Sequence, residues 1–299
     1  MRLALPAATL LLALMVHPAM NDPAAAQTMS SRDLLALPQP AADATIAYGP
    51  APQQKAELRL PRGKGPHPVV VLIHGGCWEA PWGFDHVRAL ADALRREGYA
   101  TWSLEYRRLG DPGGGWPGTL DDVALGADHL RGIAAANALD LDRVVAVGHS
   151  AGGQLALWLG GRAARPGSAD RPLRLRGVVS LAGITDLAAG AAAQVCGDAI
   201  PRLLGSVPAA VPERVAAASP IRRLPLGLPQ RLVCGARDAI VPIEQARGYE
   251  AAARAKGDDV SVTVVDGAGH FELVAPGSVA WAAVRDAVAS LLPHRKDRP

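Results

Sequence analysis

Continuous apolar segments and amphipathic segments alternate along most of the chain. Buried strands are predicted where four apolar runs occur, at residues 69–73, 101–104, 144–147 and 177–181. Uninterrupted apolar runs of this length are typical of parallel strands that are covered on both faces. Two further strands are expected at 231–234 and 260–265, and the alternation at 55–60 predicts an exposed antiparallel edge strand.

Helices are expected between these strands, at about residues 84–97, 119–138, 151–163, 242–256 and 278–292. Strands and helices that follow one another in this order predict an α/β fold, with a mostly parallel central sheet and helices on both of its faces. With 299 residues, of which 49% are hydrophobic, the chain can bury a large core. We therefore expect a single domain over residues 44–293.

Two segments depart from this alternation. Residues 27–43 are polar and contain proline, and they are expected to form a flexible lead-in. Residues 187–228 are rich in Ala, Gly and Pro and contain only short helical stretches, which favours a small cap-like insertion over the site.

Residues 1–26 have the pattern of a cleavable signal peptide. Arg2 precedes an apolar segment of about 14 residues, and three alanines stand before Gln27 as a small-residue cleavage site. The apolar segment is too short to span a bilayer, so stable membrane insertion is not expected after the signal is removed. The mature protein is predicted to be periplasmic or secreted.

The charged residues do not indicate a nucleic-acid partner. The net charge is +3, and basic residues are scattered among acidic ones rather than gathered on a face. The three cysteines, Cys77, Cys196 and Cys234, allow at most one disulfide, and none has a spacing typical of a metal or redox site. A bridge between Cys196 and Cys234 is possible, whereas buried free cysteines are the common alternative.

The strongest chemical motif is Gly148-His149-Ser150-Ala151-Gly152, which follows a predicted strand and precedes a predicted helix. This arrangement is typical of a nucleophile elbow, in which glycines flank a serine on a tight turn. The motif predicts that Ser150 is a nucleophile.

A serine hydroxyl needs a nearby base, and the base needs a carboxylate to orient it. Because reactive groups gather at the carboxyl ends of parallel strands, we expect Asp238 and His270, which follow the last two strands, to meet Ser150. Asp186 and Asp266 are the rival acids. The other histidines fall on helices, in loops or beside the nucleophile.

A third strand end carries His74-Gly75-Gly76-Cys77-Trp78. Attack on a carbonyl produces an oxyanion, which backbone N–H groups can stabilise. The expected donors are the N–H groups of Gly76, Cys77 and Ala151.

Together these motifs resemble the α/β-hydrolase fold family, in the H-G-G-x-W branch that includes kynurenine formamidases and bacterial esterase/lipase-like proteins. The resemblance extends from about Tyr48 to Leu292, and the stretch from Glu105 to Pro117 is also similar to bacterial members. It implies a hydrolase without a cofactor or metal that acts on esters or related acyl bonds. The predicted export signal argues against a kynurenine formamidase role.

Three tryptophans in loops at strand ends, Trp78, Trp82 and Trp116, are candidates for a substrate pocket. Residues 113–118 also match G-x-G-x-x-G. Pro117 removes a backbone donor and the first glycine comes several residues after the strand, so a nucleotide site is not expected.

The sequence thus predicts a serine hydrolase that cleaves a small-molecule ester through an acyl-enzyme intermediate. The alternatives are an arylformamidase-like amide hydrolase, a small exported peptidase, and a non-enzymatic binding module. The binding module predicts a missing triad member, whereas all three are present. Acyl preference and oligomeric state are not encoded in these patterns.

Overall fold

The computed structural model describes residues 27–162 and 172–293. The predicted signal peptide lies outside the described residues. Within them, no helix is both long enough and apolar enough to cross a membrane.

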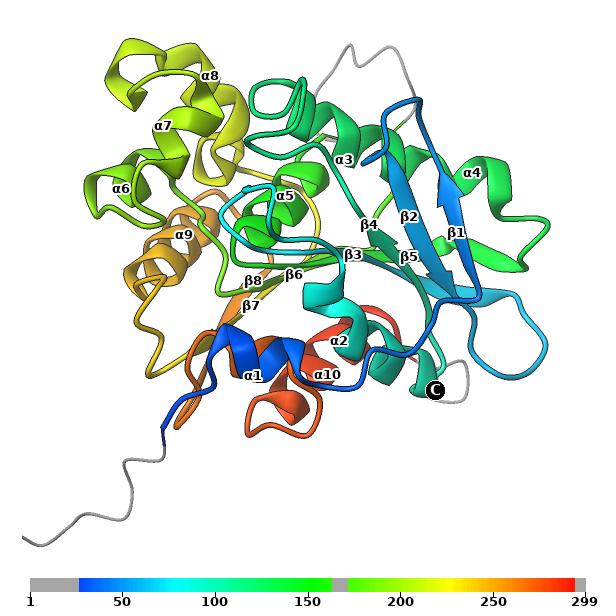
Figure 1. Cartoon of the computed structure of the whole chain (residues 1–299). Coiled ribbons are helices and arrows are strands. Elements are labelled where there is room, and N and C mark those ends of the chain that lie inside the picture. Colours follow the sequence, from blue (N-terminus) through cyan, green and yellow to red (C-terminus); the bar gives the residue numbers. More distant parts are fainter. Residues whose placement is uncertain (1–26, 163–171, 294–299) are drawn as a thin grey trace, which may run out of the picture.

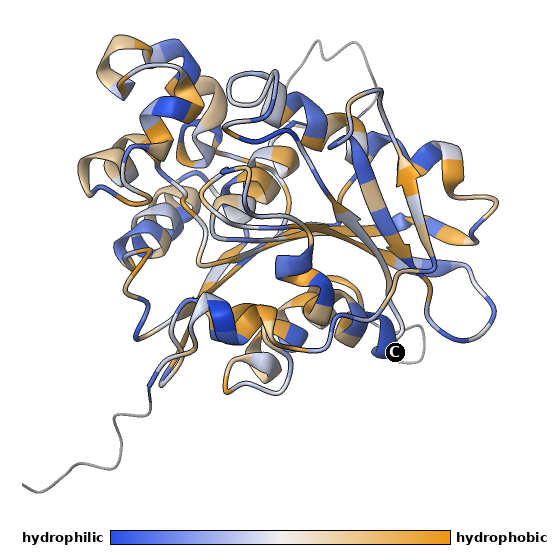
Figure 2. Cartoon of the chain, in the orientation of Figure 1, coloured by the Kyte–Doolittle hydropathy of each residue, from blue (hydrophilic) through white to orange (hydrophobic). Residues whose placement is uncertain are grey.

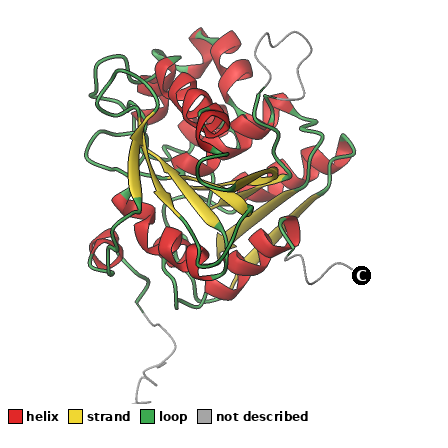
Figure 3. Cartoon of the chain, turned by 90° about the vertical axis from the view of Figure 1, so that its right-hand side faces the viewer, coloured by secondary structure: helices red, strands yellow, loops and turns green. Residues whose placement is uncertain are grey.

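An eight-stranded sheet runs through the middle of the domain (Figures 1 and 3). Its strands are, in spatial order, β1 (Ala44–Ala47), β2 (Lys55–Arg59), β4 (Ala100–Leu104), β3 (His67–Ile73), β5 (Leu139–His149), β6 (Gly177–Leu181), β7 (Gln230–Gly235) and β8 (Val260–Val265). The six strands from β4 to β8 are parallel to one another, and β2 is antiparallel to both of its neighbours. The predicted α/β architecture is confirmed.

The predicted position of β2 at the edge of the sheet is wrong. β2 pairs on one side with β4 and on the other with β1, which is the true edge strand. The four residues of β1 were too few to give a clear alternation in the sequence, and every second one is exposed.

Helices cover both faces of the sheet (Figure 1). One face carries α2 (Asp85–Arg96) and α10 (Trp281–Leu291), and the other carries α3 (Gly118–Asp128), α5 (Ala151–Gly160) and α9 (Glu244–Ala255). Along β3, Val69 and Val71 pack into the core on one face and Val70 into the core on the other. Figure 2 shows the apolar sheet between helices whose outer faces are polar. The helix predicted over 119–138 divides at His129 into α3 and α4 (Leu130–Ile133).

The segment 187–228 leaves the sheet between β6 and β7 and forms five short helical elements. These are α6 (Leu187–Ala192), α7 (Ala199–Leu204), η1 (Pro208–Ala210), α8 (Pro212–Ala218) and η2 (Pro220–Arg223). It is attached to α5, because Gln154 Nε2 donates to the Ala218 carbonyl at 2.9 Å and Trp158 Nε1 donates to the Ala217 carbonyl at 3.0 Å.

The lead-in was predicted to be flexible over residues 27–43, and this prediction is wrong for its first part. Residues Ser31–Leu35 form α1, which starts with a capping box between Ser30 and Asp33. Leu34 is only 1% exposed and packs into the core on the α2 face. A buried leucine holds this segment in place, although the residues just before it, from Ser30 to Asp33, are polar.

Candidate active site

Ser150 stands at the junction of β5 and α5, with φ 56° and ψ −121°. A positive φ is unfavourable for a residue with a side chain, by about 1–3 kcal/mol, and persists only where the surroundings impose it. Here Ser150 N–H donates to the Leu181 carbonyl of β6 at 2.8 Å. A Cβ at Gly148 would lie 2.0 Å from the Gly152 carbonyl oxygen, and one at Gly152 would lie 2.1 Å from the Ile73 oxygen. The flanking glycines are therefore required by close backbone contacts.

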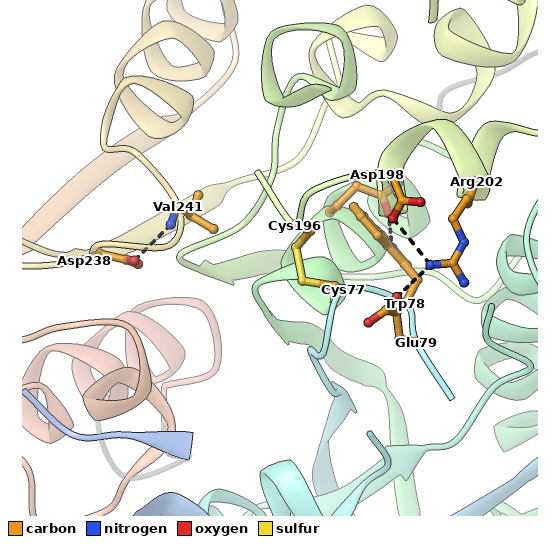
Figure 4. Close-up of a disulfide and its surroundings, with 9 residues drawn as sticks. Cys77, Trp78, Glu79, Cys196, Asp198, Arg202, Asp238 and Val241 are labelled. Carbon is orange, nitrogen blue, oxygen red and sulfur yellow. Dashed lines mark hydrogen bonds and ion pairs between the residues drawn. A yellow bond between two sulfur atoms is a disulfide. The ribbon is translucent and has the colours of Figure 1, made fainter. Parts of the chain in front are cut away.

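His270 and Asp238 are joined by a hydrogen bond of 2.7 Å between Nδ1 and Oδ2. The other oxygen of Asp238 accepts from the N–H groups of Ile240 and Val241 at 2.8 and 2.9 Å, the second of which is drawn in Figure 4. Both side chains are almost fully buried. Because the carboxylate accepts from Nδ1–H, the neutral imidazole has its unprotonated nitrogen at Nε2.

The rival acids have other positions. Asp186 is the N-cap of α6 and accepts from the N–H groups of Ala188 and Ala189. Asp266 is exposed to solvent. Of the three candidates, Asp238 is the one in contact with His270.

Two buried histidines form a hydrogen-bonded chain that ends on the backbone of His270. His149 Nε2 lies 3.0 Å from the His270 carbonyl oxygen, and His86 Nε2 lies 2.8 Å from His149 Nδ1. A carbonyl only accepts, so His149 carries its proton on Nε2, and His86 Nε2–H donates to His149 Nδ1. His149 thus points away from the nucleophile, as expected, and supports the loop of the candidate base.

This chain is neutral. Burial lowers the pKa of His86 to about 3, with smaller effects from the charges of His74 and His270. Burial also lowers the pKa of His149 well below its usual range. His86 Nδ1 is buried and has no hydrogen-bond partner within the described parts of the chain. A proton added to this nitrogen would have no acceptor, which further disfavours the charged form of the two histidines.

The loop after β3 carries the predicted oxyanion donors. Gly76, Cys77 and Trp78 have φ values of 102°, 53° and 58°, so the backbone is left-handed over three consecutive residues. In residues 27–162 and 172–293, the N–H groups of Gly76, Cys77 and Ala151 have no acceptor within hydrogen-bond distance. Unpaired N–H groups of this kind are the donors that an oxyanion hole needs.

His74 fixes the start of this loop. Its Nδ1 lies 2.8 Å from the Gly75 carbonyl oxygen and its Nε2 lies 2.8 Å from Glu105 Oε1. Both partners are hydrogen-bond acceptors, and the ring is held between them. Burial alone would raise the pKa of Glu105, but the charge and hydrogen bond of His74, together with Arg108, outweigh it and lower that pKa. Tyr106 stacks on the His74 ring and donates to the His74 carbonyl at 2.9 Å.

The three candidate pocket tryptophans differ in position. Trp78 is 0% exposed, and its Nε1–H donates to Gln154 Oε1 at 3.1 Å, so its predicted role in a substrate pocket is wrong. The left-handed backbone at residue 78 turns this side chain into the core. Trp82 is partly exposed and covers Gly76, where a Cβ would lie 2.2 Å from the indole. Trp116 is also partly exposed and packs against the core.

The disulfide joins Cys77 to Cys196, with Cα atoms 5.7 Å apart (Figure 4). The possible bridge between Cys196 and Cys234 is therefore excluded. Cys234 is the free cysteine and is buried near the end of β7. Cys196 instead lies in the turn between α6 and α7, which approaches the loop after β3.

No metal site accompanies these groups in the described ranges, because no three His, Cys, Asp or Glu side chains are grouped to hold an ion. A family model described as BD-FAE matches residues 57–252, which is more than half of the chain. The chain belongs to the BD-FAE family. The matched residues contain the loop after β3, Ser150 and Asp238, and the match ends before His270.

The BD-FAE chain is 28% identical over 244 residues to esterase LipC of Mycobacterium tuberculosis. The aligned stretch covers 77% of this chain. The chain spans 60% of the length of that relative. Among solved structures, it is similar to esterase B of Lactobacillus rhamnosis (HN001), with a TM-score of 0.73, 19% identity, and coverage of 87% of this chain and 89% of the other. A bifunctional GH43-CE of Bacteroides eggerthii matches with a TM-score of 0.69 and 23% identity, over 82% of this chain and 37% of the other. These structural likenesses show the α/β-hydrolase fold.

Three residues around the BD-FAE site were not predicted from the sequence. Glu105 holds His74, Gln154 holds Trp78, and Glu272 accepts from Gly269 N–H at 3.0 Å beside the candidate base. Gln154 could have been noticed as a polar residue inside an otherwise apolar helix, and Glu105 as an acid directly after β4. Nothing in the local sequence distinguishes Glu272.

Proposed function

We propose that the chain is a serine hydrolase that cleaves carboxylic esters of small molecules through an acyl-enzyme intermediate. Ser150, His270 and Asp238 form its catalytic triad. The observation that carries the proposal is the 2.7 Å hydrogen bond between His270 and Asp238. These two residues follow Ser150 in the order Ser, Asp, His, which is the order of the triad in proteins with a nucleophile elbow.

In the first step, Ser150 Oγ attacks the substrate carbonyl while His270 Nε2 takes its proton. Asp238 holds the Nδ1–H of His270 and stabilises the imidazolium that forms. The negative charge on the carbonyl oxygen is stabilised by the N–H groups of Ala151, Gly76 and Cys77. His270 then gives its proton to the leaving alcohol, and an ester of Ser150 remains.

In the second step, His270 removes a proton from water, which attacks the acyl-enzyme. The second tetrahedral intermediate uses the same N–H donors. Collapse of this intermediate releases the carboxylic acid and returns the proton to Ser150. Trp82, partly exposed above Gly76, is proposed to contact the substrate beside the reacting carbonyl, with Trp116 further out.

The relatives favour esters over the other acyl bonds. LipC and esterase B are both named as esterases, and the ester bond is the one that their names share. The arylformamidase-like and peptidase alternatives use the same triad chemistry but different leaving groups. A panel of an ester, an aryl formamide and a peptide anilide therefore separates these activities.

The compartment is proposed to be extracytoplasmic, with residues 1–26 acting as a cleaved signal peptide. The Cys77–Cys196 disulfide supports this proposal, because structural disulfides persist in oxidising compartments and are rare in the cytosol.

The first test replaces Ser150 by Ala. We expect hydrolysis of short p-nitrophenyl esters to fall by about 10⁶-fold, to the level of the remaining oxyanion hole. A fluorophosphonate probe should label the wild type at Ser150 and leave Ser150→Ala unlabelled, as read by mass spectrometry of the tryptic peptide. Ser103→Ala is the matched control, because Ser103 is a buried serine of β4 whose hydroxyl has no partner in the described structure. Retained turnover by Ser150→Ala would contradict the mechanism.

A further inference from the structure

The disulfide joins the oxyanion loop to the insertion. Cys77 lies in the loop after β3, and Cys196 lies in the turn that connects α6 to α7 (Figure 4). The two cysteines are 119 residues apart in the chain. One half of the bridge is therefore a residue whose N–H is a proposed oxyanion donor, and the other half belongs to the insertion.

Both sides of the bridge have a left-handed backbone. On one side these are residues 76–78, and on the other they are Gln194, Cys196 and Gly197, with φ values of 52°, 63° and 60°. Residues with side chains rarely adopt this conformation, and they keep it only where the surrounding structure holds them. Cys77 therefore needs a contact that holds its backbone in the left-handed conformation.

The residue after Cys77 is held by the core. Trp78 is completely buried, its indole N–H donates to Gln154, and its carbonyl accepts from Leu109 N–H at 2.7 Å. These contacts fix the end of the left-handed stretch. They do not reach the Cys77 side chain, which is partly exposed and whose covalent partner is Cys196.

Other contacts fix the Cys196 side of the bridge against the same region. Arg202 of α7 forms an ion pair with Glu79 at 2.8 Å, as Figure 4 shows, and it also lies 3.5 Å from Asp198. The Leu203 carbonyl accepts from Trp116 N–H at 2.8 Å. The last turn of α7 is thus attached to two loops at the carboxyl ends of strands, and the short helix as a whole supports the turn that carries Cys196.

We propose that Cys196 is a positioning residue for catalysis, which holds Cys77 through the disulfide in the left-handed conformation that directs its N–H at the oxyanion. The proposal rests on the proposed function, because it assigns a task within the same site. Breaking the bridge frees the Cys77 backbone to leave the left-handed region, so the donor is lost for part of the time. The loss affects the transition state, where the oxyanion exists, more than the bound substrate.

The third cysteine provides a matched control. Cys234 is buried in β7, and burial raises the pKa of its thiol to about 12, with a smaller effect from Asp238. It therefore stays protonated, and a buried protonated thiol does not take part in disulfide exchange. Cys234→Ala removes a cysteine from the fold without touching the bridge.

The experiment compares Cys196→Ser with wild type and with Cys234→Ala, using p-nitrophenyl acetate and active sites counted by titration with a fluorophosphonate. For Cys196→Ser we expect kcat per titrated site to fall at least tenfold and KM to change less than threefold. The rate of phosphonylation of Ser150 should fall with kcat, because the phosphoryl oxygen occupies the oxyanion hole. Cys234→Ala should keep the wild-type kcat.

If Cys196→Ser fails to fold, the folded wild type is reduced with tris(2-carboxyethyl)phosphine. The kcat should then fall as the thiols of Cys77 and Cys196 appear, and it should recover when the disulfide is reoxidised.

A bridge that serves only stability gives a different result. The melting temperature of Cys196→Ser would fall while kcat per titrated site and the phosphonylation rate stayed at wild-type values, and this outcome would overturn the positioning role alone. A wild-type protein that neither labels at Ser150 nor hydrolyses any ester of the panel would contradict the proposed function, and the positioning role with it.

Discussion

Asp238 uses both oxygens of its carboxylate, and each oxygen has a separate task. Oδ1 accepts from two backbone N–H groups of the following turn, which fixes the side chain, and Oδ2 accepts from His270. Asp186, by contrast, uses its carboxylate to cap α6. The two acids occupy the ends of neighbouring strands, so the sequence alone left both open.

A pair of substitutions separates their roles. We expect Asp238→Asn to lower kcat about 10⁴-fold, because an amide cannot orient the His270 tautomer that leaves Nε2 free, whereas Asp186→Asn should keep near-normal turnover since asparagine also caps helices. Steady-state hydrolysis of p-nitrophenyl acetate measures both. Normal turnover by Asp238→Asn with loss in Asp186→Asn would reverse the assignment.

At the scale of elements, the segment before the sheet is attached to the loop that carries His270, the proposed base. Met29 N–H donates to Glu272 Oε1 at 2.5 Å, and Gly269 N–H donates to Glu272 Oε2 at 3.0 Å. Glu272 itself is buried. One carboxylate therefore connects the chain just before α1 to the residue that precedes His270.

Replacement of Glu272 by Gln tests this connection. The amide has one accepting oxygen, so one of the two N–H groups loses its partner. We expect kcat/KM to fall about threefold to tenfold, since removing a hydrogen bond to a charged group costs about 1.5–3 kcal/mol and only part of this cost reaches His270. Glu213→Gln, on the exposed first turn of α8, is the control for loss of one charge. Equal kinetics for the two variants would exclude the connection.

The sequence predicted the long elements and missed those that depend on distant contacts. The strands β3 to β7 were recognisable because their apolar runs are largely buried on both faces, and β8 was recognisable from its run of β-branched residues, although it is the outer strand and only partly buried. α1 was missed because its buried residue, Leu34, meets the α2 side of the core only in the folded chain. The same contrast between local patterns and distant contacts applies to the candidate site. The turn at Ser150 and the pairing of Asp238 with His270 could be predicted from strand ends, whereas the conformation at Trp78 and the pairing of Cys77 with Cys196 depend on how loops approach each other in space.

For the whole molecule, the buried histidines make stability depend on pH. The pKa of His86 and that of His149 are both lowered by folding. In the unfolded chain both histidines titrate at about pH 6.5, so below this pH the unfolded chain binds more protons than the native protein. Their contribution to the free energy of unfolding is complete above this pH. It is lost as the pH falls further, by up to about 1.4 kcal/mol per pH unit for each histidine.

We therefore expect the melting temperature to fall between pH 7 and pH 5, as measured by calorimetry. His86→Gln, whose amide can still donate to His149, should flatten this dependence. His67→Gln, at the start of β3 and away from the histidine chain, should leave the slope as in the wild type. A slope that is the same in all three proteins would exclude the buried histidines as its source.

The position of the disulfide also determines which strands of the sheet it connects. Its sulfurs come from the segments after β3 and after β6, and β5 lies between these two strands in the sheet. In the folded protein the bond therefore spans three central strands and links the segments on either side of β5 covalently. Cys234 lies one strand further along, buried in β7 beside β6, so the native fold keeps the third thiol away from exchange with this bond.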